Sequence, residues 1–403
     1  MRIAVVVETF PTISETFIVN QILGYLNAGH EVRILAYHKG ADSALHESIL
    51  ANDLLQHVFY FRSFKKGKFK FILRFVLQLV IRLKFVNFPT LFELVFKLFK
   101  KSKNRLSMLE HMQWFVMQKR FDIVHAHFGP IANRVLVLKS FKTLKHTKVF
   151  TSFHGYDLRP DEIGCNRQRY HALFTMGDGF IVNTPYLRSI LKKVKGNLDC
   201  VYTIPVGLDI NTFKPECIKR IPYSLLFCGR LIEFKAPDLA IKIAHFIKSK
   251  NIDVRLSIIG EGVLESKLKK LCLELDMKNY VDFLGACKQE SVHFHMNRNQ
   301  ILIMPGIHDS VTGRAETQGL VIQEAQAMGM PVLVSDVGGM KYGLISGKTG
   351  YVLPEHDIEE FANCALNLFE NDKLRDQMGQ DAREFIKENY SIELITKKHL
   401  RIF

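Results

Sequence analysis

Short, uninterrupted hydrophobic runs alternate along the chain with longer stretches in which hydrophobic residues recur every three or four positions. The second spacing is that of a helix with one buried face, whereas the short runs are typical of strands that are covered on both faces. This alternation predicts a parallel sheet whose strands are connected by helices. In the first half of the chain we expect strands at residues 2–8, 31–37, 121–128, 148–153, 179–183 and 200–205.

The alternation starts again after a turn-rich segment, VGLDINTFKP. Strands are expected in this second half at residues 223–229, 254–260, 280–285, 300–305 and 331–335. A chain of 403 residues is also too long for one ordinary core. We therefore predict an α/β protein with two doubly wound, Rossmann-type domains that face a cleft. The expected parts are a first domain at 1–208, a linker at 209–222, a second domain at 223–385, and a C-terminal helix at 386–403 that packs back on the first domain.

The loop after the first strand, ETFPTISE, leads into a helical stretch at residues 14–28, which Gly29 ends. Thr12 and Glu15 have the spacing of a capping box at the start of this helix. The loop contains no glycine, so the G-x-G-x-x-G fingerprint of dinucleotide binding is absent from this position. Its absence argues against a nicotinamide or flavin enzyme.

The segment FKFILRFVLQLVIRLKF, at residues 69–85, does not fit this plan. Its longest uncharged run, 75–81, has seven residues, whereas a helix that spans a bilayer needs about 18 to 20. Polar residues recur instead at every fourth position, at Lys66, Lys70, Arg74, Gln78 and Arg82. A second helix at 91–101, after a break at Pro89, repeats the plan with Glu93, Lys97 and Lys101.

We expect these two helices to lie in the plane of a membrane, with apolar faces in the acyl boundary and cations at anionic headgroups. Residues 62–105 contain thirteen basic residues and one acid, and so carry +12 of the formal charge of +15. Eleven of the 31 phenylalanines lie between Phe59 and Phe99. We therefore predict a basic, amphipathic helical insertion at 62–106 that contacts an anionic membrane. One alternative is a helical pair that covers the first domain with a solvated basic edge.

Nucleic acid is not an expected partner, because outside this segment the charge is nearly balanced, although basic residues interleaved with aromatic ones keep RNA binding as an alternative. The N-terminal apolar run is interrupted at Glu8 and does not match a secretory signal peptide. The seven cysteines contain no C-x-x-C pair and indicate neither a disulfide framework nor a zinc site. We expect a cytoplasmic protein, peripheral on the inner face of the cytoplasmic membrane, without a metal or cofactor.

Two cations follow the first strand of the second domain. The sequence GRLIEFK places Arg230 and Lys235 at a turn that faces the expected cleft. Two fixed cations suit a diphosphate, whose charge grows if it leaves during a reaction. The alternative is that both are solvated surface cations.

The strand at 300–305 leads into a polar loop that reaches Glu316, and a helix then begins near Gly319. On this helix Glu324 lies on the apolar side, where a carboxylate is costly without partners. A ribose diol would supply such partners, and the free N–H groups near Gly319 and Leu320 would bind a phosphate. The alternative is a half-buried glutamate that is bonded within its own domain.

Histidines gather at the strand ends of the first domain. HGYD, with His154 and Asp157, follows the strand at 148–153, and His125 and His127 lie near the end of the strand at 121–128. One such histidine is more often structural than catalytic, but several that converge on one cleft indicate a functional site.

As a set, these motifs resemble those of the retaining GT-B glycosyltransferases of family four, the glycosyl transferases group 1. Glu316 and Glu324 have the spacing of its E-x7-E signature, GRLIEFK resembles its G-R-x(4)-K donor motif, and HGYD resembles its H-G-x-D motif. GEG at 260–262 is also typical. FPTISETFI, at 10–18, resembles the subgroup that builds colanic acid, amylovoran and similar bacterial exopolysaccharides.

The resemblance implies a GT-B fold and the metal-independent transfer of a sugar, with retention, from a nucleotide diphosphate sugar to a lipid-linked or glycan acceptor. A UDP-sugar is favoured and a GDP-sugar is possible. The implied catalytic residues are Glu316, His154, Arg230 and Lys235. The implied donor-binding residues are Arg230, Lys235, Gly260, Glu261, Gly319, Leu320 and Glu324. The acceptor side is assigned to Thr12, Ser14, His127 and Asp157.

The chain departs from the family pattern at two places. Many members have a glycine-rich loop after the first strand, and an aromatic residue often stands where this chain has Gln318. Two other functions share the architecture or the ligand: a GT-B epimerase or phosphorylase, and a non-catalytic partner of a membrane assembly complex that binds nucleotide sugars. A phosphorylase would need a pyridoxal-linked lysine, for which no clear candidate stands out. The complete set of Arg230, Lys235, Glu316 and Glu324 argues against the non-catalytic partner.

Overall fold

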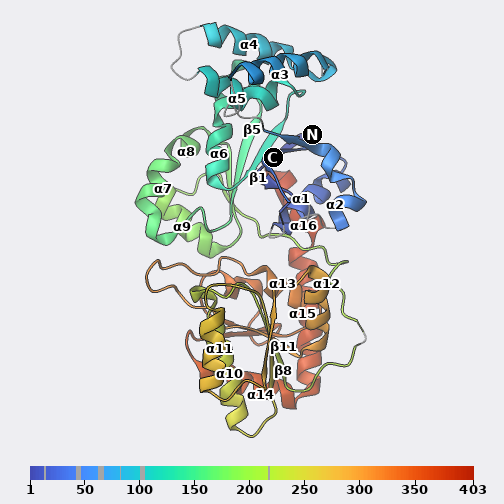
Figure 1. The fold of residues 1–403 in the computed structure, drawn as a ribbon, viewed down its shortest axis with the longest axis vertical. Coiled ribbons are helices and arrows are strands. Elements are labelled where there is room, and N and C mark those ends of the chain that lie inside the picture. The colour runs from blue at the N-terminus through green and yellow to red at the C-terminus, as the bar shows by residue number, and fades with distance from the viewer. Residues whose placement is uncertain (13–14, 42–46, 62–67, 82, 100–104, 217) are drawn as a thin grey trace.

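A computed structural model of the chain describes all residues except 13–14, 42–46, 62–67, 82, 100–104 and 217. Two α/β domains lie end to end along the long axis of the molecule, and three helices, α3 to α5, lie at the end of the first domain that is farthest from the second (Figure 1). Each domain contains one parallel sheet with helices on its faces. The prediction of two doubly wound, Rossmann-type domains is therefore confirmed.

The first domain has a seven-stranded sheet in the order β3-β2-β1-β4-β5-β6-β7, in which all neighbouring strands are parallel. Its strands are β1 Arg2–Phe10, β2 Glu31–Lys39, β3 Val58–Tyr60, β4 Ile123–His127, β5 Lys148–Phe153, β6 Gly179–Val182 and β7 Val201–Thr203. The order reverses between β1 and β4, and ligands of such sheets bind beyond the carboxyl ends of the strands at this point.

The helices of the first domain cover both faces of this sheet and one of its ends. They are α1 Thr16–Asn27, α2 Glu47–Ala51, α3 Lys68–Ile81, α4 Phe88–Phe99, α5 Arg105–Val116, α6 Gly129–Val135, α7 Ile163–Arg169, α8 His171–Met176 and α9 Pro185–Lys195. Short 3-10 helices lie between them, at Leu54–His57, Leu83–Phe85, Leu136–Ser140, Lys142–Leu144 and Pro160–Glu162.

The second domain has a six-stranded parallel sheet in the order β10-β9-β8-β11-β12-β13. Its strands are β8 Ser224–Cys228, β9 Arg255–Ile259, β10 Val281–Gly285, β11 Ile301–Met304, β12 Val332–Ser335 and β13 Gly350–Leu353. Its helices are α10 Pro237–Ser249, α11 Glu265–Glu274, α12 Gln289–Arg298, α13 Leu320–Ala327, α14 Ile358–Glu370 and α15 Asp372–Tyr390, with 3-10 turns at Glu233–Lys235 and Met340–Gly343. The order reverses between β8 and β11, so the loops after these two strands meet at one edge.

The start of α1 differs from the sequence prediction. The helix begins at Thr16, and Glu15 is its N-cap residue without a capping hydrogen bond from its side chain. Instead, the hydroxyl of Thr12 donates to the carboxylate of Glu15 at 3.1 Å. The predicted capping box is therefore wrong, because its two side chains bond to each other and not to the first-turn amides. Ser14 lies outside the described residues.

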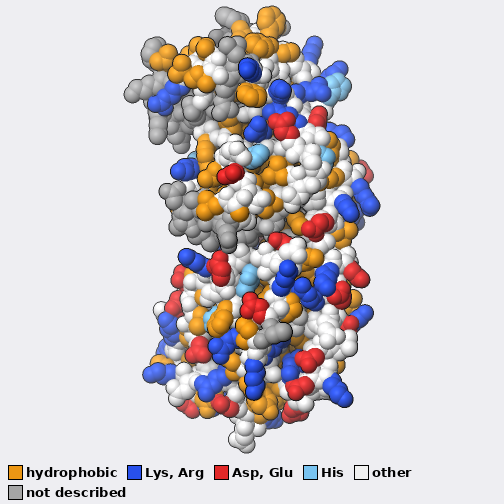
Figure 2. Space-filling view, turned by 90° about the vertical axis from the view of Figure 1, so that its right-hand side faces the viewer, with side chains coloured by type: hydrophobic (Ala, Val, Ile, Leu, Met, Phe, Trp, Pro, Cys, Tyr) orange, Lys and Arg blue, Asp and Glu red, His pale blue; other side chains and the backbone are white. Residues whose placement is uncertain are grey.

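The helices of the insertion also differ from the predicted bounds. Pro89 does not separate two helices but is the second residue of α4, where its missing N–H loses no helical hydrogen bond. In the described part of the chain, none of the helices combines the length and the hydrophobicity that a membrane span requires. Figure 2 shows hydrophobic side chains together with Lys and Arg at this end of the molecule.

The C-terminal residues form two helices where the sequence predicted one. Residues 386–390 complete α15, and α16, Ile392–Ile402, begins after Ser391. Backbone hydrogen bonds tie this junction to Leu208, which donates to Tyr390 and accepts from Ile392. α16 packs on α1 of the first domain, where Ile395 belongs to the first core and is 2% exposed. The chain therefore ends on the domain in which it begins (Figure 1).

This packing can be tested with the only tryptophan of the chain, Trp114, which is buried in the same core. We expect Ile395→Ala to destabilise the first domain by about 2 to 5 kcal/mol, since it leaves a cavity between α16 and the sheet. The measurement is urea unfolding followed by tryptophan fluorescence. Lys397→Ala, at an exposed position of the same helix, is the control and should change stability by less than about 0.5 kcal/mol. An unchanged midpoint in Ile395→Ala would contradict the packing.

Candidate active site

A cleft with a volume of about 720 Å³ lies between the two domains. Its walls come from the start of α1 and from the loops after β5 and β6 in the first domain, and from the loops after β8 and β11 in the second. This is where two sheets with facing carboxyl ends are expected to bind a ligand. The volume is within the usual range for a site that encloses a small molecule, roughly 300 to 1,000 Å³.

An ion pair stands in the wall that the second domain contributes. Lys235, at the end of the 3-10 turn after β8, donates a hydrogen bond from Nζ to Oε2 of Glu316. Both side chains are largely buried, at 12% and 14% exposure. Arg230, on the same loop, lines the cleft and is exposed. The structure thus brings together three residues that the sequence analysis selected.

Glu316 is held as an anion. Its Oε1 accepts hydrogen bonds from the backbone N–H groups of Thr317 at 3.0 Å and Gln318 at 3.4 Å. Burial alone would raise the pKa of this carboxyl, but the charge and hydrogen bond of Lys235 and these two amides outweigh it and lower the pKa below its usual value. The anionic Glu316 can therefore accept hydrogen bonds from hydroxyl groups of a ligand, and the neighbouring Lys235 can bind its phosphate groups.

The first turn of α13 opens toward the cleft. Gly319, its N-cap residue, has a φ of 73°, and a Cβ at this position would lie 2.9 Å from Cδ1 of Ile322, so the position favours glycine. Gly319, Leu320 and Val321 all line the cleft. The first N–H groups of a helix have no acceptor within it and favour an anion. This turn lies directly after Glu316, so an anion bound there would also be near Lys235.

Glu324 lies one turn further along α13 and is half-buried. Burial raises its pKa to about 7, and among the described residues no side chain or amide donates a hydrogen bond to its carboxylate. Its charge also helps to raise the pKa of the thiol of Cys228, after the larger effect of burial, so the two groups are close. Cys228 lines the cleft, whereas Glu324 does not, so this carboxylate lies next to the cleft lining and not in it.

Gly260 and Glu261 do not line this cleft, although the resemblance assigned them to the donor site. Gly260 has a φ of 134°, and a Cβ there would lie 2.0 Å from the carbonyl oxygen of Gly229. The side chain of Glu261 is exposed and accepts a hydrogen bond from the amide of Ala286 at 3.3 Å. Gly260 therefore allows the loop after β9 to pass close to the loop that carries Arg230.

His154 is the histidine that reaches the cleft. It follows β5, and its Nε2 lies 3.0 Å from Nδ1 of His127. Burial, with repulsion from His399, lowers the pKa of His154 to about 3. The ring of Phe17 packs against it with 4.9 Å between centroids. This side chain is therefore a neutral hydrogen-bonding group and not a cation at neutral pH.

The other histidines lie deeper. His127 is fully buried behind His154, and His125 is fully buried one layer further, 3.1 Å from the hydroxyl of Tyr25 and 2.7 Å from Oγ of Ser152. Neither lines the cleft. Burial holds the pKa of both imidazoles well below the usual value. Both histidines contact only other protein groups, so any effect that they have on a ligand must pass through His154.

The remaining acceptor-side candidates also make internal contacts. Asp157 is buried, and its carboxylate accepts from the backbone N–H groups of Gly129, His154 and Gly155 at 2.9, 3.0 and 3.1 Å. It thus fixes the turn that presents His154. Thr12 is bonded to Glu15, which lines the cleft while Thr12 does not.

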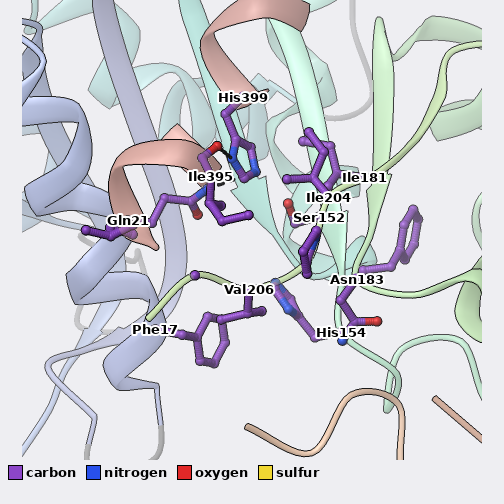
Figure 3. A pocket seen from close by; sticks show the side chains of 14 residues that line it. Phe17, Gln21, Ser152, His154, Ile181, Asn183, Ile204, Val206, Ile395 and His399 are labelled. Atoms are coloured by element: carbon purple, nitrogen blue, oxygen red, sulfur yellow. Dashed lines mark hydrogen bonds between the residues drawn. The ribbon is translucent and has the colours of Figure 1, made fainter. Parts of the chain in front are cut away.

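A second, much smaller cavity lies on the side of His154 that faces the C-terminal helix. Figure 3 shows it between Gln21, Ser152, His154 and His399. Its volume of about 20 Å³ is the size of a water molecule. It is therefore too small for a sugar, and the large cleft is the only candidate of these two for a substrate.

The sequence analysis missed three residues that join the domains at the cleft. Gln318 accepts a hydrogen bond from the N–H of Val206 at 3.0 Å and donates one to its carbonyl at 3.2 Å. Thr317 donates from its hydroxyl to the carbonyl of His154 at 3.1 Å, and Thr184 donates to the carbonyl of Thr317 at 2.8 Å. The only signal in the sequence was the departure from an aromatic residue at position 318.

No group of three or more His, Cys, Asp and Glu side chains that could hold a metal ion occurs among the described residues. Glu316, which lines the cleft, is paired with Lys235.

Two Rossmann-type domains that face one cleft with the carboxyl ends of their sheets define the GT-B fold. Solved structures of this fold agree with the whole chain. HepE of Anabaena, solved in complex with UDP and glucose, superposes with a TM-score of 0.70 at 15% identity and covers 100% of this chain and 98% of its own. A TarM variant of S. aureus, in complex with UDP among other ligands, has a TM-score of 0.71 at 15% identity and covers 100% and 99%.

Sequence comparison adds the family. The model for glycosyl transferases group 1 matches residues 211–385, and the model for glycosyltransferase family 4 matches residues 14–212. WcaL of Escherichia coli (strain K12), whose name assigns it to colanic acid biosynthesis, is 24% identical over 99% of this chain and 98% of its own. AmsK of Erwinia amylovora, named as an amylovoran biosynthesis glycosyltransferase, is 24% identical over 91% and 90%. The chain therefore belongs to the group 1 glycosyltransferases with a family 4 first domain.

The ion pair at the cleft can be measured by a double-mutant cycle. Lys235→Met leaves the largely buried carboxylate of Glu316 without its cation, and we expect a loss of about 1 to 3 kcal/mol of stability. Adding Glu316→Gln should restore part of it, because the neutral amide needs no counter-charge. Thermal unfolding of the four proteins gives the coupling energy. The exposed pair Lys242 and Asp238 on α10 is the control, with a coupling below about 1 kcal/mol. Purely additive effects at 235 and 316 would contradict the pairing.

Proposed function

We propose that this glycosyltransferase moves a sugar from a nucleotide diphosphate sugar, with retention and without a required metal, to a lipid-linked glycan acceptor. The proposed setting is the synthesis of a bacterial exopolysaccharide at the cytoplasmic face of the cytoplasmic membrane. One observation carries the donor assignment. Arg230, Lys235, Glu316 and the first turn of α13 converge on one wall of the cleft.

The chemistry of this wall suits a diphosphate that carries a sugar. The diphosphate would lie at the first turn of α13, with Arg230 and Lys235 neutralising the charge that grows as it leaves. Its phosphate oxygens compete with Glu316 for Lys235, and Glu316 is then available to accept hydrogen bonds from hydroxyls of the donor sugar. The carboxylate of Glu324, which has no protein donor among the described residues, would accept from the ribose.

UDP is the favoured nucleotide. HepE and TarM, solved with UDP, share the fold over the whole chain, and this likeness supports the choice. A GDP-sugar is the other candidate. A mannosyltransferase of Corynebacterium glutamicum named as GDP-mannose-dependent is 25% identical over 69% of this chain.

Retention is consistent with the groups at hand. In the proposed step the acceptor oxygen attacks the anomeric carbon from the face that the diphosphate leaves. The bond from that carbon to the phosphate oxygen breaks, and the acceptor proton passes to the same phosphate oxygen. In this step Glu316 accepts hydrogen bonds from hydroxyls of the donor sugar, and His154, as a neutral imidazole, orients the acceptor by hydrogen bonding.

The exopolysaccharide setting rests on the relatives. WcaL and AmsK match nearly the whole chain, and both are named for the synthesis of bacterial exopolysaccharides. The membrane setting rests on the basic and aromatic composition of residues 62–106.

Donor screening tests the activity. The protein is incubated with a panel of UDP- and GDP-sugars and a bacterial lipid extract, and release of the nucleoside diphosphate is measured. We expect release with one donor, and a loss of roughly a hundredfold or more in Lys235→Ala and Glu316→Ala, because each removes a group that acts on the leaving diphosphate or the sugar. Lys242→Ala, in an exposed pair of the same domain, should retain the activity. Release from no donor, or full activity in both cleft variants, would refute the transferase assignment.

Chelation tests metal independence. With the donor that the screen identifies, excess EDTA should leave the rate within about twofold, because Arg230 and Lys235 supply the positive charge that a metal ion would otherwise supply. A rate that falls to background in EDTA and returns with added Mg²⁺ or Mn²⁺ would overturn this part of the proposal.

A further inference from the structure

Helices α3 and α4 expose many large hydrophobic side chains at the end of the first domain. We call this set the α3–α4 apolar face. It consists of Ile72, Leu73, Val76, Leu77, Val80 and Ile81 on α3, of Phe85 in the connection, and of Phe88, Phe92 and Val95 on α4. Ile81 is 72% and Phe92 is 77% exposed. A monomeric soluble protein seldom leaves so many large apolar side chains together in water.

The spacing shows that this face is a property of both helices. On α3 the exposed residues recur every four positions in two adjacent rows, which start at Ile72 and Leu73. The opposite sides of the helices are already occupied, since Phe75 and Leu94 are buried in the first core. Each helix is therefore apolar on two sides, and the core accounts for only one of them.

The single acid of this segment does not face outward. Glu93 accepts hydrogen bonds from the N–H groups of Lys142 and Thr143 at 2.8 and 3.0 Å and from the hydroxyl of Thr143 at 2.9 Å. These bonds tie α4 to the body of the domain. Of the described cations of the segment, Arg74 and Lys84 are exposed. Two exposed cations thus accompany the α3–α4 apolar face, and Figure 2 shows Lys and Arg side chains at this end of the molecule.

We propose that the α3–α4 apolar face docks on a bilayer that contains anionic lipids. Leucine, isoleucine, valine and phenylalanine side chains enter the acyl boundary, and the basic residues of 62–105 meet the headgroups. A second copy of the chain fits poorly, because it would bring together two segments that each carry +12. RNA fits poorly as well, because aliphatic side chains offer bases neither stacking nor hydrogen bonds.

Docking at this face determines how far the cleft stands from the lipid. Residues 142 and 143, which hold α4, precede β5, and His154 follows it. A strand of six residues is about 20 Å long, and the helix layer adds about 10 Å. The bilayer and the cleft therefore lie at opposite ends of the first domain. If the proposed function holds, the acceptor must carry several sugars between its lipid and the reacting hydroxyl.

Flotation of the nuclease-treated full chain tests the docking. The protein should float with vesicles of phosphatidylglycerol and phosphatidylcholine and not with phosphatidylcholine alone. Leu77→Ser, Val80→Ser and Phe92→Ser combined should reduce the floated fraction at least about tenfold, since three large apolar side chains no longer leave water. Leu50→Ser and Leu273→Ser combined, at exposed positions elsewhere, should float like the wild type. The proposal would be overturned if the wild type did not float, or if the triple variant floated as well as the wild type. It would also be overturned if the wild type formed a dimer and the triple variant did not.

A second pair of measurements separates this proposal from the proposed function. The triple variant should bind UDP in calorimetry like the wild type, whereas Lys235→Met should lose UDP affinity and still float. To test the acceptor, membranes are incubated with the protein and the labelled donor, and the glycan is released from lipid by mild acid and sized. We expect labelled oligosaccharide. Labelled mono- or disaccharide would contradict the distance between the docking face and the cleft.

Discussion

The ion pair between Lys235 and Glu316 holds together the two loops that form the second domain's side of the cleft. Glu316 also accepts hydrogen bonds from the two amides that follow it, and these bonds constrain the backbone of residues 316–318. The next two residues of this segment bond to the first domain, through the hydroxyl of Thr317 and the amide of Gln318. The arrangement of this wall and the contact between the domains thus depend on the same short segment, residues 316–318.

The two walls of the cleft differ in their electrostatics. The second domain presents fixed charges, Arg230 and the Lys235–Glu316 pair, which suit a charged donor. The first domain presents a neutral imidazole, His154, backed by a neutral and fully buried His127. The first domain also contributes Glu15 to the lining, so this side offers an imidazole and a carboxylate, which hydrogen-bond to hydroxyl groups. This difference, rather than the motifs taken singly, supports assigning the donor to one side and the acceptor to the other.

Sequence reasoning was most successful where local pattern and tertiary structure coincide. β5 is predicted at its observed bounds, and Arg230, Lys235 and Glu316 are found because they lie in loops that follow predicted strands. β3 and β13 are missed by the sequence prediction. The inward orientation of the Asp157 carboxylate and the bridge made by Gln318 are set by contacts with distant parts of the chain. No spacing along the sequence reports such contacts.

Equilibrium binding of UDP tests the central claim most directly, namely that the cleft is built around a nucleoside diphosphate held by Lys235 and Arg230. Calorimetry with the wild type should give saturable, one-to-one binding of UDP or, if the base differs, of GDP. Lys235→Met and Arg230→Met should each weaken the binding of the diphosphate at least about tenfold, or ~1.4 kcal/mol. The corresponding nucleoside has no phosphate groups, and its affinity should be the same in the wild type and in both variants. Unaltered diphosphate affinity in both variants, or no binding of either nucleoside diphosphate by the wild type, would contradict the account.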